Sequence, residues 1–167
     1  MKISRVWEMP NKYTFKMRAV SALLAREMRG EWADPFCGLY SPASIRNDAD
    51  EANKADYHMD GLDFLKQLPD RSVDGVLFDP PYSVEQALRC YKPKHNGTAG
   101  RAEYWARCKD EISRVVKIGG KAICFGWDST GIGKTRGFAL DEVLLICHGA
   151  CHNDTIITVE VTEVKLI

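Results

Sequence analysis

The chain has no long hydrophobic run and no net charge. Its 167 residues carry 23 basic and 23 acidic side chains, and no stretch approaches the ~18 consecutive apolar residues that a transmembrane helix needs. The first residues, MKISRVWEMPNK, lack the apolar core and the small-residue cleavage site of a secretory signal. These absences exclude a membrane-spanning protein and predict a cytoplasmic one. The length predicts a single domain over residues 1–167, without a separate target-recognition domain.

Clustered cysteines are also lacking. The six cysteines lie at positions 37, 90, 108, 124, 147 and 151. Such scatter favours buried thiols over disulfides. The nearest approach to a metal motif is CHGACH at 147–152. It has no second ligand pair at zinc-finger spacing, and haem attachment requires two residues between the cysteines rather than three. We therefore predict no metal site.

Helical and strand-like segments alternate along the chain. Apolar spacing predicts helices over 18–29, 62–68 and 103–116 and strands over 31–37, 44–50, 73–78 and 121–127, followed by two further strands at 140–147 and 155–164. This order predicts an α/β domain with a mainly parallel sheet and a closing pair of strands. Ligands of such sheets bind beyond the carboxyl ends of the strands.

The strand predicted over 73–78 ends abruptly in Asp79-Pro80-Pro81-Tyr82. Consecutive prolines end sheet pairing and make a stiff loop. In that loop the Asp79 carboxylate and the Pro80 carbonyl can accept both hydrogens of one amino group. Tyr82 offers a ring on which a heterocycle can stack, a contact worth ~1–3 kcal/mol per base. A simple turn after a buried strand is the structural alternative.

This DPPY segment resembles the motif (D/N/S)PP(Y/F) of amino-methyltransferases, and the Asp form is most similar to the adenine-N6 enzymes of DNA. GGKAICFGWDSTGIGKTRGF and HGACHNDTIITVE resemble the carboxyl-terminal part of small, single-domain methyltransferase-like proteins of phages and mobile elements. The resemblance implies a Rossmann-like methyltransferase fold with an antiparallel C-terminal strand. It also implies S-adenosylmethionine as cofactor and DNA, or RNA, as partner.

The same resemblance assigns cofactor-binding residues. Asp34-Pro35-Phe36-Cys37-Gly38 is similar to the cofactor motif DPFxGxG, Asp48 to the acid that binds the ribose, and Asp60 with Gly61 to the acid-containing turn that meets the cofactor adenine. Thr14-Phe15 resembles the segment that closes over the methionine end. The second glycine of the motif is missing. Only six residues lie between Cys37 and Ser44, whereas a helical crossover takes about a dozen, so we expect the first crossover helix to be shortened or absent and the cofactor to bind weakly.

A basic segment supplies candidate nucleic-acid contacts. Residues 89–109 contain six Lys or Arg and one Glu, interleaved with Tyr91, Tyr104 and Trp105. Basic side chains suit phosphates and aromatic rings suit unpaired bases. We predict that the nucleic acid is contacted by Arg89, Lys92, Lys94 and Arg101. Because no recognition domain is expected, target reading would come from loops, a homodimer or a separate partner.

Three other functions remain open. Gly131-Ile132-Gly133-Lys134-Thr135 resembles a phosphate-binding NTPase loop, but the pattern requires Gly at position 128, where this chain has Asp128. We interpret it as a glycine-rich loop beside the DPPY turn. A non-catalytic nucleic-acid-binding module that keeps the fold is the second alternative. The third is methyl transfer to RNA or to a protein amide.

Overall fold

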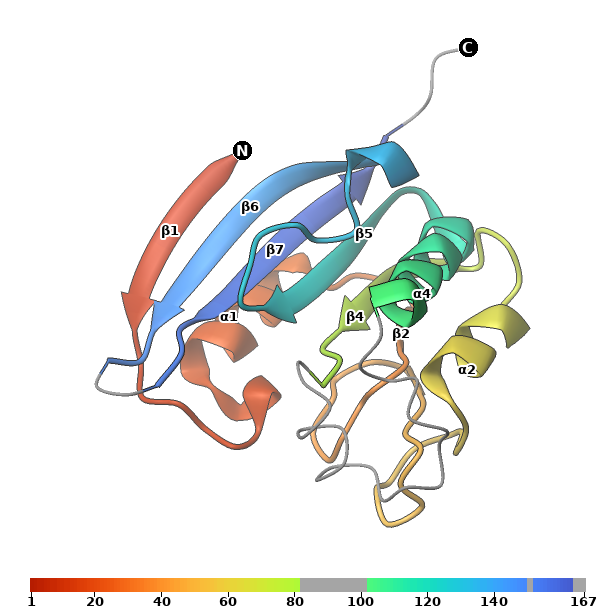
Figure 1. Ribbon diagram of the computed structural model, residues 1–167, viewed down its shortest axis with the longest axis horizontal. Coiled ribbons are helices and arrows are strands. Elements are labelled where there is room, and N and C mark those ends of the chain that lie inside the picture. The colour runs from red at the N-terminus through yellow and green to blue at the C-terminus, as the bar shows by residue number, and fades with distance from the viewer. Residues whose placement is uncertain (82–101, 150–151, 164–167) are drawn as a thin grey trace.

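The strands form one sheet at the centre of the molecule. The computed structural model describes residues 1–81, 102–149 and 152–163 (Figure 1). The seven strands of this part are ordered β1-β6-β7-β5-β4-β2-β3. They are β1 (Lys2–Trp7), β2 (Trp32–Asp34), β3 (Ile45–Arg46), β4 (Val73–Phe78), β5 (Val116–Gly126), β6 (Phe138–Cys147) and β7 (Thr155–Thr162).

Strand β7 is the antiparallel member of this sheet. It runs antiparallel to both β5 and β6, whereas the other neighbouring strands pair in parallel. The β-branched run of β7 is buried between its two neighbours, as expected for a central strand. The prediction of a mainly parallel sheet with an antiparallel C-terminal strand is confirmed.

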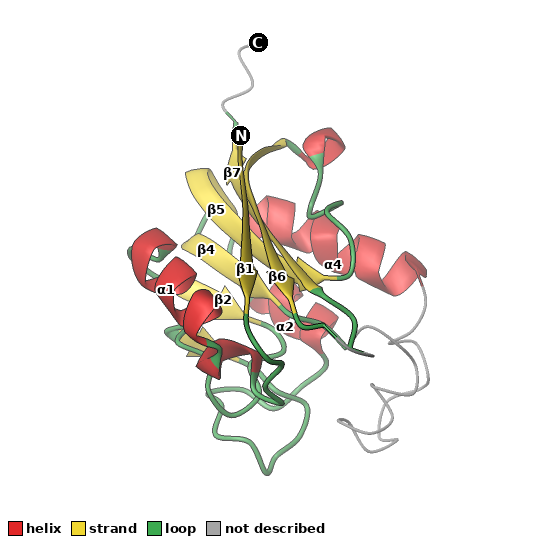
Figure 2. Cartoon of the chain, turned by 90° about the vertical axis from the view of Figure 1, so that its left-hand side faces the viewer, coloured by secondary structure: helices red, strands yellow, loops and turns green. Residues whose placement is uncertain are grey.

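Helices cover the two faces of the sheet unequally. Helix α1 (Arg18–Glu27) lies on one face, and α2 (Gly61–Gln67) and α4 (Ala102–Val115) lie on the other (Figure 2). Two short 3₁₀ turns, η1 (Thr14–Lys16) and η2 (Lys134–Arg136), complete the described helices. Helix α4 buries Tyr104, Cys108, Ile112 and Val115, a stripe at helical spacing. None of the helices in the described ranges is long and apolar enough to cross a membrane.

Several boundaries differ from the sequence prediction. Strands β2 and β3 are shorter than expected, and residues 35–44 between them form turns rather than a helix, which confirms the reduced first crossover. Strand β5 starts directly after α4, at Val116 instead of the predicted residue 121, and runs through Gly119 and Gly120. Val116 pairs with Val73 of β4, the register then shifts, and pairing with β4 and β7 is regular from Lys121 onward.

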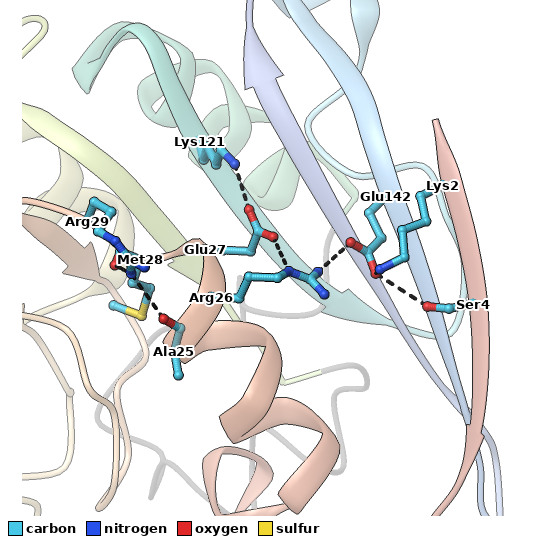
Figure 3. A network of polar contacts seen from close by, with 9 residues as sticks. All are labelled: Lys2, Ser4, Ala25, Arg26, Glu27, Met28, Arg29, Lys121 and Glu142. Carbon is cyan, nitrogen blue, oxygen red and sulfur yellow. Dashed lines mark hydrogen bonds and ion pairs between the residues drawn. The ribbon is translucent and has the colours of Figure 1, made fainter.

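A chain of charged side chains ties β1 to the rest of the fold (Figure 3). The Lys121 ammonium contacts Glu27 at 2.6 Å, and Arg26 contacts both Glu27 and Glu142. Glu142 on β6 is 6% exposed and also accepts hydrogen bonds from Lys2 and from the Ser4 hydroxyl, at 3.0 and 3.3 Å. Three of these contacts therefore depend on one buried carboxylate.

Replacing Glu142 by Ala is expected to lower the free energy of unfolding by about 1–3 kcal/mol, because charge-assisted hydrogen bonds to a buried group are lost. Urea denaturation followed by far-UV circular dichroism measures the change. Asp63→Ala is the control: its ion pair with Lys66 is 64% exposed on the Asp63 side, so removal should cost less than about 0.5 kcal/mol. Equal losses in the two variants would contradict the role given to Glu142.

Candidate active site

The predicted catalytic turn lies at the carboxyl edge of the sheet. Strand β4 ends at Phe78, and Asp79, Pro80 and Pro81 follow it directly. Its parallel neighbours β2 and β5 end at Asp34 and Gly126, so residues from three strand ends meet at one edge. Asp79 is half-buried there. Tyr82 lies outside the described residues.

A cavity of about 360 Å³ opens beside this turn, within the size range of small-molecule sites. Its lining joins three segments that are distant in sequence: residues 12–15, 36–40 and 48–53. Of the predicted cofactor and catalytic residues, those that line it are Thr14, Phe15, Phe36, Cys37, Gly38, Asp48, Asp79, Pro80 and Pro81. Asp34, Pro35, Asp60 and Gly61 do not line the cavity.

Asp34 is fully buried behind the cavity. Its carboxylate accepts hydrogen bonds from the Phe36 N–H at 2.9 Å and from the Ser41 hydroxyl at 2.6 Å. Burial raises the pKa of Asp34 to about 7, and the negative charges of Asp79 and Asp48 act in the same direction. The side chain therefore shapes the turn after β2 and adds an ionisable group next to the cavity.

Asn47 and Asp48 replace the missing crossover helix as the support of this turn. The Asp48 carboxylate accepts the N–H groups of Gly38 at 2.8 Å and Asp50 at 2.9 Å. The buried Asn47 amide donates to the Pro35 and Met59 carbonyls, each at 3.0 Å. Side chains thus bind backbone groups that a helix would otherwise have satisfied.

Asp60 and Gly61 have structural partners in this fold. The Asp60 carboxylate caps α2 by accepting the Leu62 N–H at 2.9 Å, and it also accepts the Tyr104 hydroxyl at 2.9 Å. A Cβ atom at Gly61 would lie 2.5 Å from the Phe36 ring, so the glycine allows the helix start to approach the cavity wall. Contact of these two residues with a cofactor stays a prediction.

A second cavity, of about 190 Å³, also borders the proline turn. Pro80 and Pro81 line both cavities. Aromatic rings and charged groups share the second one, which is lined by Phe78, Trp105, Lys109, Cys124, Phe125, Gly126, Trp127, Asp128 and Gly131. The glycine-rich loop therefore lies next to the proline turn. Of the aromatic residues in the basic segment, Tyr104 is buried in the core and Trp105 lines this cavity, whereas Tyr91 lies outside the described residues.

The loop around residues 131–135 is not built as a phosphate-binding loop. The Ile132 and Gly133 N–H groups donate to the buried Glu160 carboxylate, at 2.5 and 3.0 Å. A P-loop needs such N–H groups for phosphate oxygens and opens into a helix. Here the 3₁₀ turn Lys134–Arg136 leads into strand β6 instead. This geometry argues against the NTPase alternative.

One residue of the possible metal motif, His148, has structural partners in the fold. His148 is buried, and its ring nitrogens contact the Glu8 carbonyl at 2.6 Å and the Thr155 hydroxyl at 2.9 Å. No group of three or more potential metal ligands occurs among the described residues. Cys151 lies outside them, as do the predicted nucleic-acid contacts Arg89, Lys92, Lys94 and Arg101.

Sequence reasoning missed six residues that line the first cavity: Lys12, Tyr13, Leu39, Tyr40, Asp50 and Asn53. The Tyr13 and Tyr40 rings meet edge to face at 4.7 Å, and the Lys16 ammonium lies 4.4 Å from the centre of the Tyr40 ring. Asp50 and Asn53 belong to the polar run NDADEAN at 47–53, a loop signal that could have identified them. No local sequence pattern indicated the ring contacts of Tyr13 and Tyr40.

No family model matches the sequence. Among curated proteins, the chain is similar to the type II methyltransferase M.BamHI of Bacillus amyloliquefaciens, with 30% identity over 69 residues. That match covers 41% of this chain and 16% of the relative, so the chain aligns with a small part of that protein.

Solved structures resemble most of the chain. A SAM-dependent methyltransferase of Methanosarcina mazei has a TM-score of 0.58 at 11% identity, with 86% of this chain and 98% of that chain covered. The Burkholderia thailandensis 1,6-didemethyltoxoflavin-N1-methyltransferase with bound S-adenosylhomocysteine has a TM-score of 0.59 at 9% identity, with 88% of this chain and 78% of that chain covered. TrmN of Thermus thermophilus has a TM-score of 0.55 at 16% identity, with 87% of this chain and 49% of TrmN covered. The chain therefore has the predicted Rossmann-like fold of SAM-dependent methyltransferases.

Proposed function

We propose that the chain transfers a methyl group from S-adenosylmethionine to the exocyclic N6 amino group of adenine in DNA, with the target base flipped out of its stack. The observation that carries this proposal is the shared wall: Pro80 and Pro81 line both cavities of the carboxyl edge, and Asp79 lines the larger one. A donor in one cavity and an acceptor in the other would meet at the Asp79-Pro80-Pro81 turn.

The larger cavity fits the cofactor in size and in chemistry. When bound, S-adenosylmethionine supplies a methyl group on a positively charged sulfur. Three carboxylates of the lining, Asp48, Asp50 and Asp79, suit a cation, and the rings of Phe15 and Tyr40 suit a heterocycle or a cation–π contact. We assign Asp48 and Asp50 to the polar groups of the cofactor and the rings to its adenine or sulfonium.

The smaller cavity suits a planar acceptor. Trp105 and Trp127 line it, and aromatic side chains of this kind can stack with an unpaired base. Lys109 adds a positive charge. The DNA and adenine assignments rest on the DPPY resemblance and on the basic residues at 89–101; methyl transfer as such rests on the fold and on the two cavities.

The proline turn would act on the amino group of the acceptor. That nitrogen is a poor nucleophile because its lone pair is conjugated with the ring. If Asp79 and the Pro80 carbonyl each accept one N–H hydrogen, the lone pair is freed toward the methyl carbon. As the N–C bond forms and the C–S bond breaks, the positive charge passes to the nitrogen, where the Asp79 carboxylate stabilises it and the proton leaves toward Asp79 or solvent.

Calorimetric titration followed by a transfer assay tests this proposal. S-adenosylmethionine and ATP are titrated separately into the protein. Tritiated methyl transfer is then measured to adenine-containing single-stranded and duplex DNA, to the matching RNA, and to oligonucleotides in which cytosine replaces every adenine. We expect cofactor binding, no ATP binding and label only in adenine-containing DNA. Label in RNA alone would change the acceptor class, and no cofactor binding would favour the non-catalytic module.

A further inference from the structure

The loop that forms one wall of the smaller cavity is bound at its middle by two side chains: Glu160 accepts two of its N–H groups, and Arg136 donates to the Ile132 carbonyl at 3.2 Å. Asp128 and Gly131 of this loop line the cavity, and in Figure 1 the loop after β5 crosses in front of β7. Glu160 points from β7 to the loop and accepts the Ile132 and Gly133 N–H groups, at 2.5 and 3.0 Å. Glu160 is only 2% exposed.

Burying a carboxylate at this position is energetically unfavourable. Buried acids are disfavoured unless hydrogen bonds or charges compensate for lost hydration. Thr158 and Val159, which precede Glu160 on β7, are also buried. Burial raises the pKa of Glu160, and the two loop N–H groups and the Lys109 ammonium oppose that rise. The acid is thus kept in place by its bonds to the loop.

The loop backbone is shaped to receive this carboxylate. Gly131 and Gly133 have φ values of 53° and 100°, and this conformation turns successive N–H groups toward one anion. A Cβ atom at Gly131 would lie 2.1 Å from a Glu160 carboxylate oxygen. Gly131 is therefore required both by its backbone angle and by the closeness of Glu160.

The two ends of the loop have separate supports. The Asp128 carboxylate accepts the Thr130 N–H at 2.8 Å. At the other end, Arg136 contacts Asp110 of α4 at 2.6 Å, and its backbone carbonyl accepts the Ser113 hydroxyl at 2.7 Å. Loss of Glu160 would consequently leave the Ile132 and Gly133 N–H groups without their acceptor, next to Gly131 of the cavity wall. The loop would stay attached to the fold through Arg136 and through the buried Ile132 side chain.

We propose that Glu160 is a positioning residue for the methyl acceptor: it fixes the middle of the loop at 128–133 and so sets the wall of the cavity that holds the acceptor heterocycle. This role rests on the proposed function. Because Glu160 does not line the larger cavity, the affinity for the acceptor and the turnover should depend on Glu160, whereas the affinity for the methyl donor should not.

The test compares Glu160→Gln and Gly131→Ala with the wild type. A Gln amide offers one acceptor oxygen where the loop presents two N–H donors, and an alanine at 131 collides with Glu160. In both variants KM for an adenine-containing single-stranded DNA oligonucleotide should rise about tenfold or more, with the Kd of S-adenosylmethionine unchanged. Amide hydrogen exchange at Ile132 and Gly133 should become faster in Glu160→Gln.

Two control variants separate positioning from general destabilisation. Glu142→Gln alters a buried carboxylate that bonds Lys2, Ser4 and Arg26 instead of the loop. Gly119→Ala introduces the same backbone strain, since φ is 78° there, but the new Cβ has no heavy atom within 4 Å. Both controls should leave KM for the oligonucleotide unchanged. A similar KM rise in either control, or equal weakening of donor and acceptor binding in Glu160→Gln, overturns the proposal.

Failure of the inference and failure of the proposed function give different results. If the wild type transfers methyl groups and Glu160→Gln keeps the wild-type KM, kcat and amide exchange, Glu160 has no positioning role. If the wild type transfers no methyl group to any nucleic acid, the acceptor assignment and the role resting on it fall together. Amide exchange at Ile132 and Gly133 then still decides whether Glu160 anchors the loop.

Discussion

Replacement of Asp79 by Ala is expected to lower the rate of methyl transfer by at least about 100-fold, the usual effect of removing one preorganised group that stabilises developing charge. The carboxylate lies directly after β4, at the wall of the larger cavity, where it can accept an N–H hydrogen and balance the positive charge of the methylated nitrogen. The measurement is single-turnover transfer of labelled methyl groups to adenine-containing DNA, with the Kd of S-adenosylmethionine determined in parallel by calorimetry. That Kd should stay close to the wild-type value, because other side chains line most of the cavity.

Asp74→Ala is the matched control for this experiment. Asp74 lies on the same strand, toward its opposite end, where its carboxylate contacts Lys117 and accepts the Glu31 N–H, both at 2.8 Å. Its replacement removes the same chemical group without touching either cavity, so transfer should continue at the wild-type rate. Full activity in the Asp79 variant would refute the proposed mechanism. Loss of cofactor binding together with activity would assign Asp79 to the donor instead of the acceptor.

Elements whose signals are local could be predicted from the sequence. Strand β4 has the predicted bounds, Val73–Phe78, because its apolar run is followed at once by Asp and two prolines. Strand β1 had no comparable signal: its residues are largely exposed, and it exists as a strand because it pairs with residues 142–147 of β6. A partner so distant in sequence leaves no trace in a segment of six residues.

The candidate site could be predicted where its residues follow strands. The segments after β2 and β4 were expected at one edge of the sheet, and the structure brings residues 36–38 and 79–81 to one cavity. The contribution of Tyr13 and Tyr40 could not be predicted, because their ring contact joins two irregular segments. Asp60 has a local explanation that competes with the resemblance, since an acid before a helix is a common N-cap and the structure shows that cap.

Asp34 is expected to make the stability of the protein depend on pH between about 4 and 7. Burial raises its pKa from 3.8 to about 7, so in this interval the folded chain binds a proton that the unfolded chain has lost. The free energy of unfolding should therefore fall as pH rises through this window, by up to about 1.4 kcal/mol per pH unit and on the order of 4 kcal/mol in all. Above pH 7 both states are ionised and the contribution becomes flat.

Asp34→Asn removes this dependence while keeping the local hydrogen bonds. The amide oxygen can accept the Phe36 N–H, and the amide N–H₂ can donate to the Ser41 oxygen, the two partners of the carboxylate. We expect the variant to match the wild type near pH 4 and to exceed it in stability at pH 8, as measured by urea denaturation at intervals of one pH unit.

Asp56→Asn is the control. Hydrogen bonds with Arg46 lower the pKa of Asp56 below 3.8, so the stabilisation by Asp56 is lost only at more acidic pH. The dependence of the unfolding free energy on pH between 5 and 8 should therefore equal that of the wild type. Parallel curves for the wild type and Asp34→Asn would mean that Asp34 is ionised throughout this range. The Asp34 carboxylate would then be negatively charged at pH 5, and its ionisation would not raise the affinity for a cationic donor between pH 5 and 8.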